Sequence, residues 1–142
     1  MGSKGRQRTR AWWSLPGADP AGLLLGFLGL YLIAVSLLML VSPGTFFNEI
    51  APFGIQNDHY IRDAASFQLA LGALALFAVR EPGLRPVALV VITLQFVIHT
   101  VNHLVDINAT DPAWLGPADF IALALMSALA ILLLRESRRS WQ

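Results

Sequence analysis

Four long runs of apolar residues alternate with short polar segments along the chain. The runs cover residues 21–41, 60–79, 87–105 and 118–134. A helix of about 20 apolar residues crosses the roughly 30 Å hydrocarbon core of a bilayer, and each run is close to that length. The first run is apolar on all sides, whereas a helix of a soluble bundle needs a polar face. The pattern therefore predicts an all-α polytopic membrane protein, a single four-transmembrane-helix bundle over residues 1–142.

The segments between and within the runs add detail to this bundle. Residues 42–58 combine turn residues with phenylalanines and isoleucines, which predicts an outer lid loop over the mouth of the bundle rather than one regular helix. Residues 80–86 contain a Pro-Gly pair and predict a tight turn. In the first run, Gly22, Gly26 and Gly29 lie on one side of the helix. Their spacing favours close packing on a helix of the same bundle, with contact in a homo-oligomer as the alternative.

Most of the positive charge lies on one side of the predicted membrane. Nine of the ten basic residues precede the first run, separate the second from the third, or follow the fourth: Lys4, Arg6, Arg8, Arg10, Arg80, Arg85, Arg135, Arg138 and Arg139. The positive-inside rule then predicts cytoplasmic termini in a multi-pass membrane protein. Short arginine clusters beside spans indicate topology, so the expected partner is lipid and not nucleic acid. Trp12 and Trp13 suit the inner aromatic belt, and Trp114 suits the outer one.

Composition narrows the chemistry. Hydrophobic residues make up 56% of the chain and charged residues 13%, which is low for a soluble domain and supports the membrane interpretation. The chain contains no cysteine, which excludes thiolate metal sites, disulfide exchange and cysteine nucleophiles.

The third apolar run carries a polar stripe in its last third. Gln95, His99, Asn102 and Asp106 fall on one helix face, with His103 at its edge. Ionisable groups in a spanning helix cost about 2.5–3.5 kcal/mol each, so such a cluster indicates a site. The predicted topology brings further polar residues to the same outer end: Glu49, His59, Arg62, Asp63, Ser66 and Asp119.

Two pairs of potential metal ligands are each separated by one helical turn, His59 with Asp63 and His99 with His103. If the second and third spans are adjacent and antiparallel, the pairs meet as three histidines and one aspartate. That donor set suits Zn²⁺, or Fe or Mn, and predicts a divalent metal site. The residues expected to surround and orient the ligands are Asn102, Asp106, Asp119, Arg62 and Glu49.

Two alternatives to the metal site stay open. The same residues can form an ion-pair and hydrogen-bond network without metal, as polar residues do in membrane bundles. They can also bind quinone or haem. Haem is disfavoured because its two axial ligands would have to be histidines from different helices. Only His59 with His99 or His103 meets this condition, and no second pair is left for a relay of two haems.

Three segments carry a family resemblance. They are Ser42-Pro43-Gly44 before an aromatic pair, the sequence IRDAASFQLALG at residues 61–72, and the Arg-Pro inner loop. Through them the chain resembles the DoxX-like families of small four-helix bacterial membrane proteins. Some members of those families are associated with quinone-linked sulfur or thiol oxidation. The resemblance therefore implies a quinone-linked membrane context, although the chain has no cysteine for thiol chemistry and no catalytic roles are carried over.

Three functions follow from these patterns. The first is a metal-dependent membrane enzyme, in which Zn²⁺ lowers the pKa of bound water to about 7 for hydrolysis of a lipid amide or ester and Ser66 hydrogen-bonds the oxyanion. The second is a non-catalytic accessory subunit of a larger quinone- or redox-linked membrane complex. The third is a carrier of metal ions or protons, which requires a homo-oligomer to enclose a path.

Overall fold

A computed structural model describes residues 19–139, and every regular element in this range is helical. The elements are α1 (Pro20–Val41), α2 (Pro43–Glu49), α3 (Asp58–Arg80), the 3₁₀ turn η1 (Pro82–Leu84), α4 (Arg85–Val105) and α5 (Leu115–Arg139). Of the described helices, α1, α3, α4 with η1, and α5 are long and apolar enough to cross a membrane. The prediction of an all-helical chain with four membrane-length helices is confirmed at this level. The basic residues at positions 4–10, Trp12 and Trp13 lie outside the described residues.

Side-chain caps and prolines set where the helices begin. A carboxylate oxygen of Asp19 accepts a hydrogen bond from the backbone N–H of Ala21 at 3.2 Å, and Pro20 opens α1. The Asn57 Oδ1 atom accepts from the N–H groups of His59 and Tyr60 at 3.1 and 3.3 Å. These caps extend α1 and α3 beyond the apolar runs, because capping satisfies N–H groups that have no partner in the first turn.

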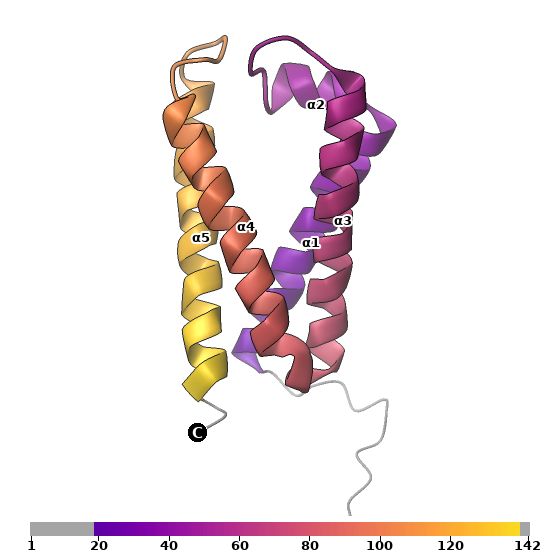
Figure 1. Ribbon diagram of the computed structural model, residues 1–142, viewed down its shortest axis with the longest axis vertical. Coiled ribbons are helices and arrows are strands. Elements are labelled where there is room, and N and C mark those ends of the chain that lie inside the picture. The colour runs from indigo at the N-terminus through magenta and orange to yellow at the C-terminus, as the bar shows by residue number, and fades with distance from the viewer. Residues whose placement is uncertain (1–18, 140–142) are drawn as a thin grey trace, which may run out of the picture.

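The long helices form two antiparallel pairs, α1 with α3 and α4 with α5 (Figure 1). The pairs approach each other where α1 begins and α5 ends, which we call the closed end. They diverge toward α2 and the loops 50–57 and 106–114, which we call the lid end. Both ends of the described chain lie at the closed end, so the arrangement has the even number of crossings that the predicted topology requires.

Glycines allow the close approach of α1 and α3. A Cβ atom added to Gly72 would lie 2.7 Å from Ile33 Cγ1 and 2.9 Å from the carbonyl oxygen of Gly29. A Cβ atom added to Gly26 would meet only Val79, at an ordinary 3.7 Å. The predicted packing of the small-residue face inside the bundle is therefore confirmed at Gly29, while Gly26 is not at the tightest contact.

The main hydrophobic core fills the closed half of the bundle. Leucines from α1 and alanines from α3 meet both small and large apolar residues of α4 and α5 there: Leu25, Leu28, Ala75, Ala78, Ala88, Leu89, Ile92, Ala130 and Leu133. Arg85 joins three elements at the same end, because its guanidinium pairs with Asp19 and donates to the carbonyl oxygens of Ala78 and Val79, each at 3.2 Å. Packing and this ion pair hold the two helix pairs together where they converge.

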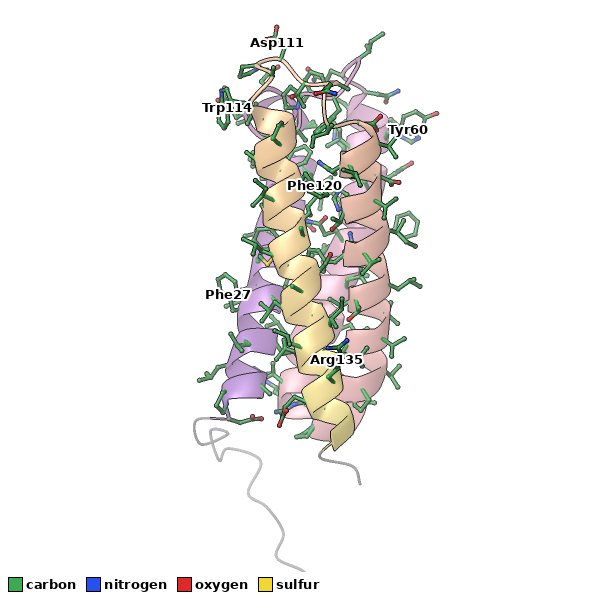
Figure 2. All side chains as sticks on the ribbon, turned by 90° about the vertical axis from the view of Figure 1, so that its left-hand side faces the viewer. Phe27, Tyr60, Asp111, Trp114, Phe120 and Arg135 are labelled. Carbon is green, nitrogen blue, oxygen red and sulfur yellow. The ribbon has the colours of Figure 1, made fainter. Side chains whose placement is uncertain are left out.

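The lid differs in one respect from the expected loop. Within residues 42–58, Pro43–Glu49 forms the short helix α2, since Pro43 occupies its first turn, where no N–H donor is needed. The lid continues to Phe53, which forms an isolated antiparallel bridge with Thr110 of the opposite outer loop. Trp114 and Tyr60 extend outward at this end (Figure 2), and Trp114 is largely exposed, as a residue of an interfacial belt would be.

Candidate functional site

A cavity of about 690 Å³ lies between the two helix pairs in the half of the bundle nearer the lid. Its lining is mainly apolar and comes from α1, α2, α3, α4 and α5: Leu32, Val35, Met39, Phe46, Ile50, Ala51, Ile61, Ala64, Phe67, Leu71, Phe96, Ile98, Ala122 and Leu123. Phe67 and Ile98 line the cavity from α3 and α4 and are also exposed on the outside of the bundle. The cavity therefore extends toward the lipid-facing surface between these two helices.

One wall of the cavity is polar. Gln95, His99, Asn102 and His103 line it from α4, at the helical spacing that the sequence indicated, and Asp119 joins them from α5. Asp106, the remaining member of the predicted stripe, is the exposed C-cap residue of α4 and is not part of the lining. The predicted polar face is thus confirmed for Gln95, His99, Asn102 and His103.

The two histidines of α4 contact each other directly. Their Nε2 atoms lie 3.1 Å apart, and the Gln95 Nε2 atom lies 3.4 Å from His99 Nδ1. The ring of Phe53, in the lid, packs edge-on against His103 with a centroid distance of 4.7 Å. The lid thus contacts the end of a hydrogen-bonded row that runs from Gln95 through His99 to His103.

Three polar atoms of this wall are buried and, within the described part of the chain, have no hydrogen-bond partner. They are Gln95 Oε1, His103 Nδ1 and Asp119 Oδ2. An unpaired polar atom in an apolar setting costs about 1–3 kcal/mol, so such atoms in native proteins are usually satisfied by a ligand, an ion or water. All three atoms belong to residues that line the cavity, so a ligand that displaces the atoms covering them could restore these hydrogen bonds.

The histidine–aspartate pair of α3 lies elsewhere. His59 Nε2 and Asp63 Oδ2 are 3.4 Å apart, with the side chains 79% and 58% exposed, and neither residue lines the cavity. Among the residues that the structure describes, no group of three or more His, Cys, Asp or Glu side chains is placed to hold a metal ion. The structure therefore brings His99 and His103 together but does not bring His59 and Asp63 to them.

The pairing of the helices explains this separation. The predicted four-ligand set requires α3 and α4 to face each other at the lid end. Instead, the Gly29–Gly72 contact holds α3 against α1, and α3 diverges from α4 beyond the short η1 connection (Figure 1). The buried face of α3 consists of small residues that face this contact, and His59 and Asp63 are left on its exposed surface.

The other residues expected around the site divide in the same way. Asn102 and Asp119 line the cavity. Arg62 pairs with Asp58 at 3.8 Å, the exposed Ser66 hydroxyl donates to the Asp63 carbonyl oxygen at 2.7 Å, and Glu49 lies exposed at the end of α2. Ser66 is therefore engaged with its own helix, away from the cavity wall formed by α4 and α5.

Three polar residues of the cavity were not predicted. Tyr31 of α1, and Tyr60 and Gln68 of α3, line it from the helix pair opposite the histidines, and the Gln68 Nε2 atom donates to the Leu32 carbonyl oxygen at 3.5 Å. None of the three belongs to a long polar stripe like that of the third run, so periodicity did not single them out. For Tyr31 and Gln68, a single polar residue at mid-depth of a span was the available signal.

The chain matches no protein-family model, no curated protein and no solved structure. The resemblance to the DoxX-like families accordingly rests on the short segments quoted above. The geometry of the site is that of a large, mainly apolar cavity between two helix pairs, with hydrogen-bond donors and acceptors concentrated on one wall.

Proposed function

We propose that this protein binds a membrane-dissolved amphipathic small molecule, of the isoprenoid quinone class, in the cavity between its helix pairs. The observation that carries the proposal is the set of unpaired buried atoms, Gln95 Oε1, His103 Nδ1 and Asp119 Oδ2, on one wall of an otherwise apolar cavity. Ligand sites typically combine an apolar lining with a few convergent polar groups. A quinone supplies an apolar ring and tail, its carbonyl oxygens can accept from a donor such as His103 Nδ1, and the hydroxyl groups of its reduced form can donate to Gln95 Oε1 and Asp119 Oδ2.

The proposed setting is the bacterial inner membrane, with both termini in the cytoplasm and the lid end outside. The distribution of basic residues supports this orientation, because the lid-end loops contain no Lys or Arg. The quinone would enter between α3 and α4, where Phe67 and Ile98 are shared by the cavity and the outer surface. In this proposal the protein is a non-catalytic accessory subunit that holds quinone for a larger membrane complex.

Ligand binding to the full-length protein in lipid nanodiscs tests the proposal. A short-chain quinone should stabilise the protein against thermal unfolding, by about 2.7 kcal/mol when its concentration is 100 times the dissociation constant. His99→Ala should weaken this stabilisation, because it removes the centre of the polar row. The matched control is His59→Ala, which changes a histidine outside the cavity and should respond like the wild type.

Two results would contradict quinone binding in this cavity. One is a wild-type protein whose unfolding is unaffected by saturating quinone. The other is an equal loss of the effect in His59→Ala and His99→Ala, which would place binding outside the cavity or make it nonspecific.

A divalent metal at His99 and His103 is a second candidate function. The 3.1 Å separation of their Nε2 atoms favours it, because two imidazoles one helical turn apart can chelate one Zn²⁺, Fe or Mn ion. Metal analysis of the same preparations separates the possibilities. If His99 and His103 alone chelate the metal, His99→Ala should lose it and His59→Ala should keep it. If His59 and Asp63 also bind the metal, both variants should lose it. A wild-type protein without metal would argue against both metal sites.

A further inference from the structure

We propose that Gln95 and His99 are positioning residues that hold the proton of the His103 imidazole on Nδ1, so that this ring donates a hydrogen bond to an accepting oxygen of the ligand. The inference rests on the proposed function. It specifies whether His103 offers the ligand a hydrogen-bond donor or an acceptor. It follows from the direction in which each hydrogen bond of the Gln95–His99–His103 row can run.

The direction is set at Gln95. The Nε2 atom of a glutamine amide carries two hydrogens and can only donate. It lies 3.4 Å from His99 Nδ1, so His99 Nδ1 must act as the acceptor in this contact. A neutral imidazole with an accepting Nδ1 carries its proton on Nε2. Gln95 therefore selects the Nε2–H tautomer of His99.

The same reasoning passes to the second ring. His99 Nε2, now a donor, lies 3.1 Å from His103 Nε2, which must accept. His103 then carries its proton on Nδ1. A second proton on either ring would place two N–H groups against each other, so the row as built requires both imidazoles to be neutral. Neutral rings are also lower in free energy than charged rings in a membrane-spanning helix.

The row ends in a donor with no protein partner. His103 Nδ1 is buried and, among the described residues, has nothing to donate to, and the edge-on Phe53 ring of the lid covers the same imidazole. A carbonyl oxygen of a ligand would complete the row. A hydroxyl could complete it only by accepting, which leaves its own hydrogen for Gln95 Oε1 or Asp119 Oδ2. The donor at His103 thus requires an oxygen that can accept on the ligand, which a carbonyl or a hydroxyl group can supply.

The tautomers can be measured directly without ligand. Imidazole ¹⁵N chemical shifts of the full-length protein in nanodiscs distinguish Nδ1–H from Nε2–H, and the chain has three histidines, which single substitutions assign. We expect Nε2–H at His99 and Nδ1–H at His103. Gln95→Leu should reduce the Nδ1–H population of His103, although Gln95 does not contact that ring. An Nε2–H tautomer at His103 in the wild type, or no change in Gln95→Leu, would overturn the inference.

Binding of a short-chain quinone to two His103 variants provides the second test. An asparagine amide can place its N–H near the position of Nδ1, whereas a glutamine amide reaches the position of Nε2. His103→Asn should keep the dissociation constant within about threefold of the wild type, and His103→Gln should raise it by about tenfold, the usual effect of losing one buried hydrogen bond. The reverse order would overturn the inference. If the wild type binds no quinone, the proposed function fails, while the tautomers measured without ligand still decide this inference.

Discussion

The ion pair between Asp19 and Arg85 connects the beginning of α1 with the beginning of α4. Asp19 caps α1, and Arg85 begins α4 while donating to the last turns of α3. The hydrogen bond from Arg85 holds the pKa of Asp19 below its ordinary value of 3.8, although partial burial opposes this effect. The pair therefore links the two helix pairs electrostatically at the closed end, outside the apolar part of the spans.

Replacing Asp19 with asparagine should reduce stability in a pH-dependent way. Asparagine can still cap α1 but cannot pair with Arg85, so we expect a loss of about 1 kcal/mol in the free energy of unfolding, the upper range for a partly exposed ion pair. A carboxylate with a lowered folded-state pKa stabilises the fold above its unfolded value of 3.8, and this contribution is lost as the pH falls through the folded-state value.

Unfolding in detergent at pH 7 and at several pH values below 4 measures this effect. The difference between wild type and Asp19→Asn should be constant above pH 5 or so and shrink below about 3.8. A difference that persists unchanged at low pH would mean that Asp19 acts through something other than its charge.

At the scale of the elements, small residues decide which helices become partners. The shortest distances around an added Cβ atom at Gly29 and Gly72 involve the other helix of the α1–α3 pair, including backbone atoms that cannot move aside. In the α4–α5 pair, a hydrogen bond between the Thr100 and Ser127 hydroxyls, 2.8 Å long, bridges the helices. Both pairs therefore have an internal contact, and the cavity lies where the two pairs separate.

Gly72→Ala should separate α1 from α3 and destabilise the protein by about 1–3 kcal/mol, as overpacking of a tight contact does. The matched control is Gly26→Ala, because an added methyl group there meets only Val79 at 3.7 Å. The control should stay within about 0.5 kcal/mol of the wild type. Unfolding in mixed micelles by added denaturing detergent compares the two variants, and equal stabilities would remove the role assigned to the Gly29–Gly72 contact.

On the scale of the whole molecule, the two ends of the bundle differ in build. The closed end contains the core and the Arg85 interactions, whereas the lid end contains the cavity, α2 and the bridge from Phe53 to Thr110. Figure 1 shows both outer loops at one end and the α3–α4 connection at the other. The cavity lies in the half of the bundle nearer the lid. The orientation of the protein therefore determines which side of the membrane the cavity is closer to.

Cysteine labelling tests the proposed orientation. The chain contains no cysteine, so one introduced residue gives an unambiguous signal. In intact cells, an impermeant maleimide should label cysteine at the exposed lid-end positions Asn48 and Asn108 but not at Gly83. Labelling at Gly83 instead would show that the lid end faces the cytoplasm. Thr110 is buried against the lid and is a poorer position for the label.

The sequence alone determined the number and apolar character of the long helices and the polar face of α4, whereas their ends differ from the predicted runs, most of all in α5, which covers Leu115–Arg139 and not 118–134. These features depend on local properties, namely the length of an apolar run and the helical period, and they hold whichever helices become neighbours. The same reasoning located Gln95, His99, Asn102 and His103 on one face, which is the wall of the cavity.

Only the tertiary structure decided which helices face each other. The metal prediction joined His59 and Asp63 to the α4 histidines by assuming that consecutive spans face one another at the outer end. The glycine contact instead holds α3 on α1, so His59 and Asp63 are exposed while Asp119 of α5 reaches the cavity. Helix pairing depends on close approach between residues distant in sequence, here Gly29 and Gly72. Each such contact is decided by whether one or two side-chain atoms fit between the helices. A periodic pattern along one helix does not contain that information.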